Sequence, residues 1–196
     1  MEEQFIYELT AVENAREKNL TLTQEKEKKD LPKYLEKRYI NQMLDKCKDH
    51  KKKMLVLFLF RTGVRITEAI NLTKKDINFD EGFMQVRWLK SRKYHKRTVP
   101  IHKTVLELLN LYTGPLGIND KLFDFSRQRA YQITKEVLNA SPHQLRHSFA
   151  VHWLRSTGDI FILSRVLGHS RIQTTMEYLK IVPVDQRKEL NNINFS

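Results

Sequence analysis

Two arginines lie where helices are expected to begin, a position that suits an anion. Arg65 follows a Thr-Gly break, and Arg146 lies three residues after His143 in a second helical segment. Residues three apart share one side of a helix, so we expect Arg146 to point outward beside His143, away from the apolar face of Leu145 and Phe149. A lone His-x-x-Arg pair is typical of a solvated surface. Two guanidinium forks near helix N-termini could instead hold one phosphate.

A tyrosine near the end of the chain is a candidate nucleophile. The segment LGHSRIQTTMEYLK (167–180) predicts a helix that begins just after His169, with Ser170 as N-cap and Gln173 completing a capping box. Its apolar stripe consists of Ile172, Met176 and Leu179. Tyr178 lies roughly 100° or more from that stripe, so we expect its ring to lie off the buried face.

Other chemistries fit the motifs less well. His143 and His147 have the spacing of an H-E-x-x-H zinc site, but Gln144 replaces the glutamate and Arg146 would place a cation beside the metal. The sequence contains neither a G-x-S-x-G nucleophile elbow nor a glycine-rich phosphate loop. We therefore expect no metal, no ATP and no other cofactor.

The composition favours a nucleic-acid partner. The 196 residues carry a formal net charge of +12, and 40% of them are hydrophobic. Such a basic globular protein suits a polyanion, with nucleic acid ahead of an anionic membrane. The longest apolar run, residues 54–60, is far shorter than the ~20 residues that span a bilayer. The single cysteine, Cys47, and the lack of a signal peptide indicate a cytoplasmic protein.

Helical periodicity dominates the stretches that must position these residues. Helices are expected within 31–50, 51–63, 64–72, 102–112, 126–138, 141–158 and 159–168. Glycines 63, 158 and 168 end three of them, while Ser126, Ser141 and Asp159 cap others.

One short region changes period. Asp80, Glu81 and Gly82 form a turn, and alternation over 84–88 predicts a strand. Residues 97–101 read as the returning strand, with Pro100 at its edge or end, and residues 90–96 as a basic hairpin tip. The fold class is therefore mostly α with a small antiparallel β-sheet.

Taken together, the motifs resemble the catalytic domain of the tyrosine recombinase, or phage integrase, family. That family shows the order Arg, Lys, His-x-x-Arg, His, Tyr. The stretches RTGVRITEAINL, SPHQLRHSFAVHWL and LGHSRIQTTMEYLK match it in order and spacing, with Tyr178 nine positions after His169. The resemblance covers about residues 31–180 and implies the recombinase catalytic-domain fold.

The resemblance implies a role for each matched residue. Tyr178 would attack a DNA phosphodiester, leaving a 3′-phosphotyrosine and a free 5′-hydroxyl. Arg65 and Arg146 would clamp the non-bridging oxygens, His169 would donate to them, and His143 would accept the tyrosine proton. The leaving oxygen takes its proton from a hairpin lysine, for which Lys90 fits best.

The hairpin also supplies candidate DNA contacts. Lys93 and Arg92 lie close enough to compete with Lys90 as proton donors. Glu68, one turn after Arg65, is expected to orient an arginine rather than to react. The residues expected to contact DNA are Arg92, Lys93, Lys96, Arg97 and Arg171.

The resemblance also suggests a domain organisation and partners. Residues 1–30 are expected to be a charged arm without a full core-binding domain, 31–180 the catalytic domain, and 181–196 a tail that docks on a neighbouring protomer. The partners would be double-stranded DNA, further copies in a tetramer on two DNA sites, and an accessory DNA-binding protein.

Two other functions share these features. A type IB topoisomerase uses the same chemistry to relax supercoils as a monomer. A basic regulator could keep the fold without the chemistry, but it would lack Tyr178 or an arginine, and none is missing. The expected function is site-specific DNA recombination of the integrase type, inside the cell.

Overall fold

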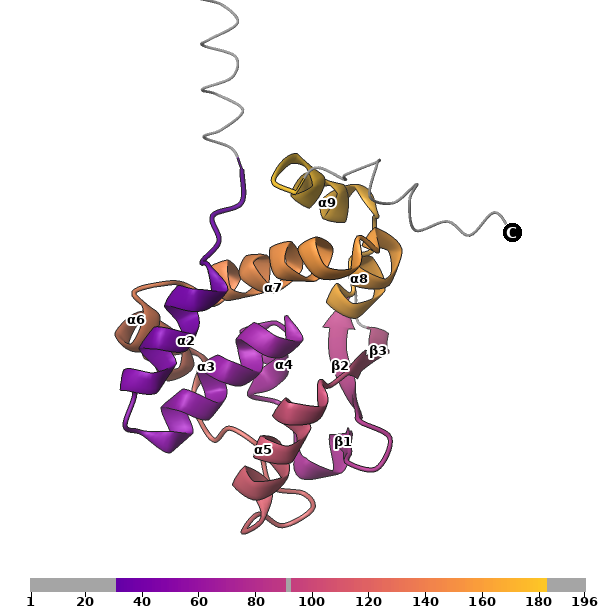
Figure 1. Cartoon of the computed structure of the whole chain (residues 1–196). Helices are drawn as coiled ribbons and strands as arrows, with labels where there is room; N and C mark the ends of the chain where they lie inside the picture. Colours follow the sequence, from indigo (N-terminus) through magenta and orange to yellow (C-terminus); the bar gives the residue numbers. More distant parts are fainter. Residues whose placement is uncertain (1–30, 91–92, 183–196) are drawn as a thin grey trace, which may run out of the picture. The chain divides into compact units, whose positions relative to one another are not determined.

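Helices and one small sheet make up the described part of the chain, as expected (Figure 1). The computed structural model describes residues 31–90 and 93–182. The helices of this part are α2 (Lys37–Lys46), α3 (His50–Thr62), α4 (Ile66–Ala69), α5 (Lys103–Thr113), α6 (Arg127–Leu138), α7 (Pro142–Thr157), α8 (Ile160–Leu167) and α9 (Gln173–Met176). Two 3₁₀ turns, η1 (Lys74–Asp76) and η2 (Glu177–Lys180), complete it. The chain divides into two units, Met1–Pro32 and Lys33–Ser196. The expected N-terminal arm and most of the expected tail lie outside the described residues.

Three antiparallel strands form the sheet in the order β1 (Ile77–Asn78), β2 (Phe83–Lys90) and β3 (Lys93–Pro100). The predicted turn joins β1 to β2, and β3 ends at Pro100 as predicted. The prediction of a long basic tip over 90–96 was wrong, because Lys90 pairs with Lys93 and the ladder continues between them and the core. Ladder hydrogen bonds join backbone groups, so a run of basic side chains does not end them.

Local capping signals set most helix boundaries. At the start of α7 the Ser141 backbone N–H donates to Oε1 of Gln144 at 2.9 Å, and the Gln144 N–H donates to Oγ of Ser141 at 3.3 Å. Gly63 ends α3 in the left-handed conformation, with φ +64°, and a side chain there would collide with the ring of Phe149. These predictions were confirmed, whereas the helix expected over 64–72 shortens to the four residues of α4.

The last helical segment differs from its prediction. Its first helix is capped by Ile172 rather than Ser170, and after Met176 it tightens into η2. Thr175 and Tyr178 are buried, while Met176 is 47% exposed. The 100° helical wheel fails here because the 3₁₀ turn has three residues per turn, which places residues i and i+3 on one face. The expectation that Tyr178 lies off the buried face was therefore wrong.

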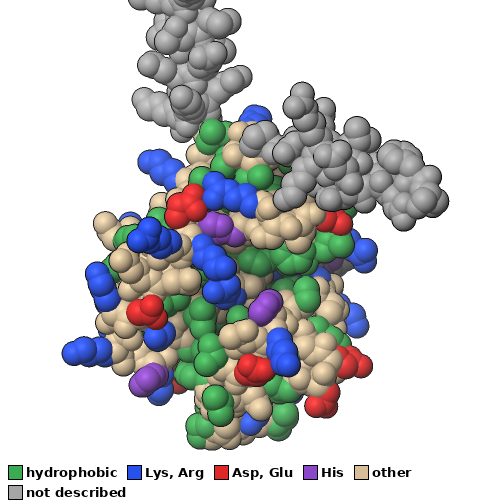
Figure 2. Space-filling model, viewed as in Figure 1, with side chains coloured by type: hydrophobic (Ala, Val, Ile, Leu, Met, Phe, Trp, Pro, Cys, Tyr) green, Lys and Arg blue, Asp and Glu red, His purple; other side chains and the backbone are tan. Residues whose placement is uncertain are grey.

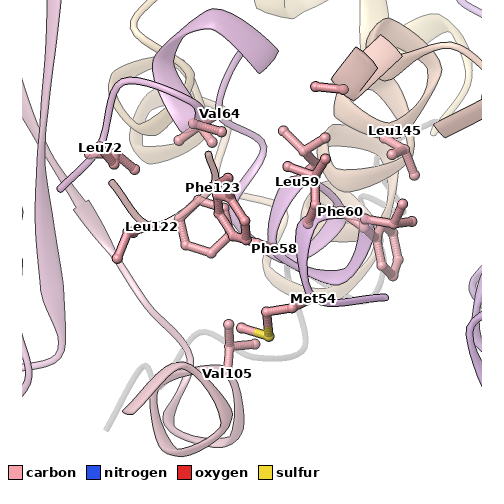
Figure 3. Close-up of a cluster of buried hydrophobic side chains, with 14 of the residues drawn as sticks. Met54, Phe58, Leu59, Phe60, Val64, Leu72, Val105, Leu122, Phe123 and Leu145 are labelled. Carbon is pink, nitrogen blue, oxygen red and sulfur yellow. The ribbon is translucent and has the colours of Figure 1, made fainter. Parts of the chain in front are cut away.

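Helix α3 runs through the main hydrophobic core. Phe58 and Leu59 on α3 are almost fully buried, and they meet Phe123 and Leu145 from more distant parts of the chain (Figure 3). A second cluster joins α7 and α8 to the end of the described chain through Ala150, Val151, Leu154, Leu163, Leu167 and Tyr178. This second cluster holds the candidate nucleophile.

The packing brings four distant segments together. Helix α7 packs across α3 and also contacts α8 and η2, while α8 packs beside β3 (Figure 1). The start of α4, the first turns of α7, the loop after α8 and η2 therefore converge. No helix among residues 31–90 and 93–182 is both long and apolar enough to cross a membrane.

Candidate active site

Arg146 ties the site together from inside the fold. Its Nη1 donates to the Gly63 carbonyl at 2.7 Å and its Nη2 to the Leu167 carbonyl at 2.6 Å. The residue is 5% exposed, so the expectation that it points outward was wrong. The two carbonyls belong to the ends of α3 and α8, where backbone oxygens lack helical partners, and they draw the guanidinium inward.

Glu68 holds two further arginines. Its carboxylate accepts paired hydrogen bonds from the Nη atoms of Arg97, at 2.9 and 2.8 Å. It also accepts one from Nη1 of Arg65 at 3.1 Å and one from the Arg65 backbone N–H at 2.7 Å. Nε of Arg97 donates to the Val166 carbonyl at 2.9 Å, which links β3 to α8. The Arg97 side chain, expected among the DNA contacts, is only 8% exposed.

The charges of Glu68 and the neighbouring arginines shift one another's pKa values. Burial favours a raised pKa for Glu68, but hydrogen bonds and charge from Arg97, together with Arg65, bring its pKa below the usual value. Burial and the neighbouring charge of Arg65 lower the pKa of Arg146 to about 10. Arg146 therefore stays charged at neutral pH.

His169 lies in the loop after α8, where a buried threonine orients its ring. Its Nδ1 is 2.8 Å from Oγ1 of Thr175. Burial, followed by the charges of Arg146 and Arg65, lowers the pKa of His169 to about 4. The ring is thus neutral at pH 7, and a hydrogen bond from the threonine to Nδ1 would leave the Nε2–H as its donor.

Tyr178 contacts His147, which the sequence had suggested only as a possible zinc ligand. The Tyr178 hydroxyl lies 2.8 Å from Nδ1 of His147. Tyr178 is 3% exposed, and this burial raises its pKa, an effect that the charge of Arg146 partly offsets. His143, the expected proton acceptor, is exposed in the first turn of α7, with its ring centroid 6.2 Å from that of His147.

A basic groove opens beside these residues. It has a volume of about 960 Å³ and runs between α4, β3 and the loop after α8. Its lining includes Arg65, His95, Lys96, Arg165 and His169. Lys and Arg side chains are also spread over the face that Figure 2 shows, with fewer acidic side chains between them. The groove can therefore take a chain of phosphates.

The remaining predicted residues fall at the edge of the described structure. Lys96 is exposed and lines the groove, and Arg171 is exposed just before α9. Lys90 and Lys93 are paired at the ends of β2 and β3, but their side chains, and all of Arg92, lie outside what the structure describes.

Three residues of the site were missed by sequence reasoning. Arg165 lies in the last turn of α8, where its basic charge at a helix end was the available signal. His147 was visible in HQLRH, one turn after His143. Thr175 was predicted only as a structural or phosphate-contact residue, and its contact with His169 carried no signal, because a buried threonine that makes one hydrogen bond resembles any other helical threonine.

Comparisons with known proteins show the family of this chain. Residues 33–183 match the model of the phage integrase family. Tyrosine recombinase XerA of Pyrococcus furiosus is 33% identical over 186 residues, which cover 85% of this chain and 63% of that protein. The chain thus spans less than two thirds of the length of this curated relative.

Solved structures share the fold. The crystal structure of XerA recombinase matches with a TM-score of 0.68 at 25% identity, covering 84% of this chain and 67% of that one. A crystal structure of XerH site-specific recombinase bound to palindromic difH substrate, in a post-cleavage complex, matches with a TM-score of 0.65 at 22% identity. The two matched parts are 83% of this chain and 53% of that one. The expected catalytic-domain fold is confirmed.

Proposed function

This chain belongs to the phage integrase family of tyrosine recombinases, and from that premise we propose that it cuts and rejoins DNA at specific sites through Tyr178. The observation that carries the proposal is the convergence of Tyr178 with arginines and neutral histidines, two of which, Arg65 and His169, line a basic groove. The name of the XerA relative, and the DNA substrate bound by the XerH relative, support the same reaction class. Residues 31–180 form the catalytic domain.

The arginines bind the scissile phosphate. Arg65 lines the groove, and its side chain is 38% exposed, so it reaches a phosphate while Glu68 orients it. Arg146 donates two of its five guanidinium N–H groups to backbone carbonyls. Its other N–H groups can therefore donate to a phosphate oxygen. Together they stabilise the charge that develops on the non-bridging oxygens in the transition state.

The histidines and the hairpin lysine complete the reaction. His169, neutral and fixed by Thr175, donates a hydrogen bond to the same oxygens, and His143 contacts the phosphate from the start of α7. Tyr178 forms the 3′-phosphotyrosine, and Lys90 gives a proton to the leaving 5′-oxygen. The covalent link conserves the energy of the phosphodiester, so a 5′-hydroxyl reverses the step without ATP or metal.

Strand exchange extends the proposal to an assembly. The enzyme works as a tetramer on two DNA duplexes, and the tail 181–196 docks on a neighbouring protomer. Exposed Phe161 and Ile162 on α8 (72% and 49%) offer apolar surface for such contacts. An accessory DNA-binding protein supplements site selection, and the protein resides with DNA inside the cell. If a chain truncated after Ile181 still assembles and exchanges strands as the wild type does, the docking of the tail on a neighbouring protomer is refuted.

A suicide DNA substrate tests the chemistry directly. The protein is incubated in EDTA with a nicked duplex that loses its 5′-hydroxyl fragment after cleavage, and covalent adducts are separated by denaturing electrophoresis. Wild type should form the adduct, Tyr178→Phe should form none, and Tyr131→Phe, on the exposed surface of α6, should match wild type. An adduct that survives in Tyr178→Phe, or its absence in wild type, overturns the proposal.

A further inference from the structure

The hydroxyl of Tyr178 has a specific partner that the family pattern of arginines, lysine, histidines and tyrosine does not include. Its oxygen lies 2.8 Å from Nδ1 of His147, and the two ring centroids are 5.7 Å apart at an interplanar angle of 55°. This distance is within the reach required of a general base and the proton that it removes. The tyrosine is 3% exposed and His147 is half-buried, so the contact is partly shielded from water.

The fold fixes His147 at this position. It follows Arg146 directly on α7 and lies one turn after His143, while η2 packs against α7 and brings Tyr178 to it. The charge of Arg146 contributes to the pKa values of His147, His169 and Tyr178, so its guanidinium lies near enough to act on all three. A phosphate bound by Arg146 would therefore lie on the same side of α7 as the pair of Tyr178 and His147.

We infer that His147, rather than His143, is the catalytic residue that accepts the proton of Tyr178 during DNA cleavage. The inference rests on the proposed function and assigns one step within it. His143, exposed at the first turn of α7, is left to contact phosphate.

The charge state of His147 suits an acceptor. Burial, and then the charges of His143 and Arg146, lower the pKa of His147 to about 4, so the ring is neutral at pH 7 and one nitrogen keeps its lone pair. The other titratable group facing it is Tyr178, from η2, and the charge of His147 also reaches His169 in the loop after α8. A bound phosphate offsets the positive charge around His147, which raises its affinity for the proton as the reaction proceeds.

The proton transfers of cleavage are reversed in rejoining. In cleavage the Oη–H bond of Tyr178 breaks, its proton moves to Nδ1 of His147, the Oη–P bond forms and the P–O5′ bond breaks. The 5′-oxygen takes its proton from the hairpin lysine. In rejoining, protonated His147 returns its proton to the tyrosine oxygen as the Oη–P bond breaks, and the lysine recovers its own.

A single-turnover measurement of adduct formation tests the inference. In His147→Asn the amide keeps a polar atom near the place of Nδ1 but cannot accept a proton, so we expect the rate to fall about 10²-fold or more. The matched control is His152→Asn, a half-buried histidine of the same helix that contacts the Leu35 carbonyl, and it should keep the wild-type rate. Thermal melting establishes that each variant is folded.

A modified substrate separates the two proton transfers. Sulfur in the 5′-bridging position gives a leaving group that needs no proton, so loss of the proton donor no longer matters. The defect of His147→Asn should persist on this substrate, because the tyrosine still needs an acceptor. Restoration of the wild-type rate would assign His147 to the leaving group and overturn the inference.

The remaining outcomes are also decisive. If folded His147→Asn keeps the wild-type rate and pH profile, His147 is not the proton acceptor. The proposed function would still stand in that case, provided that the wild-type protein forms the adduct. If the variant does not fold, ¹⁵N NMR of the histidines in the wild-type protein replaces it. The inference requires the proton of His147 on Nε2, and finding it on Nδ1 would contradict the acceptor role.

Discussion

At the scale of single residues, the site depends on side chains that hold other side chains. Thr175 does not face the groove, yet its hydroxyl lies 2.8 Å from Nδ1 of His169 and holds the ring in its orientation. Tyr178 and His147 form a second pair of this kind. In each pair a hydroxyl contacts Nδ1 of a histidine, and the tautomer of that ring decides which of the two partners donates.

Replacing Thr175 by valine removes that hydroxyl without changing the shape of the side chain. We expect adduct formation to slow about tenfold, the equivalent of one hydrogen bond of ~1.4 kcal/mol, since His169 loses its fixed orientation. Thr175→Ser keeps the hydroxyl and should stay close to wild type. Equal rates for the valine and serine variants, measured in single-turnover assays, would rule out this role.

At the scale of elements, the buried ion pair between Arg97 and Glu68 fastens the hairpin to α4, and the Val166 carbonyl fastens it to α8. Arg97 thus contacts Glu68, which in turn contacts Arg65, so we propose that it is a positioning residue for the phosphate site. Its neighbour Lys96 is exposed in the groove and suits a direct phosphate contact.

Substitution of Arg97 should change stability, whereas substitution of Lys96 should change the salt dependence of DNA binding. Arg97→Lys keeps the charge but loses the paired hydrogen bonds, so we expect a loss of about 1–3 kcal/mol in unfolding free energy and slower adduct formation. The salt dependence of DNA binding should not change. Lys96→Gln should reduce that log–log slope by about 1 and leave stability within ~0.5 kcal/mol. A reduced slope in Arg97→Lys, with unchanged stability, would contradict the assignment.

Elements were predictable where their signals are local. The capping box of Ser141 and Gln144 and the stop at Gly63 involve residues within a few positions of each other, and both were confirmed. The inward turn of Arg146 was not predictable, because its carbonyl partner at Gly63 lies 83 positions away. The contact between His147 and Tyr178 spans 31 positions, and hydrophobic periodicity carries no information on such polar pairs.

At the scale of the whole molecule, the two neutral histidines make stability depend on pH. His147 and His169 have pKa values lowered to about 4 in the fold, against about 6.5 in an unfolded chain. Between these values the unfolded state binds more protons than the folded state, so lowering the pH favours unfolding. Below about pH 4 both histidines are protonated in the folded and the unfolded state, so they cause no further loss of stability.

We therefore expect the melting temperature to fall as the pH decreases from about 7 to 4. The His147→Asn, His169→Asn double variant should show a flatter dependence over this window, since the lowered pKa of Glu68 contributes only near its acidic end. Calorimetry across the range measures both. An unchanged slope in the double variant would mean that other groups cause the dependence.

The segment that carries the nucleophile consists of two helical turns, α9 and η2, of four residues each. Helices so short do not persist on their own, and tertiary contacts hold them in place. Local opening of this segment should cost much less than global unfolding, and its amide protons should exchange with solvent faster than those of α3. The proposed site is complete only while Tyr178 and Thr175 keep their packed positions, so we expect the opening equilibrium to set the fraction of active molecules. We therefore expect that a neighbouring protomer or a DNA strand that touches this segment would regulate the proposed cleavage without altering any group that reacts.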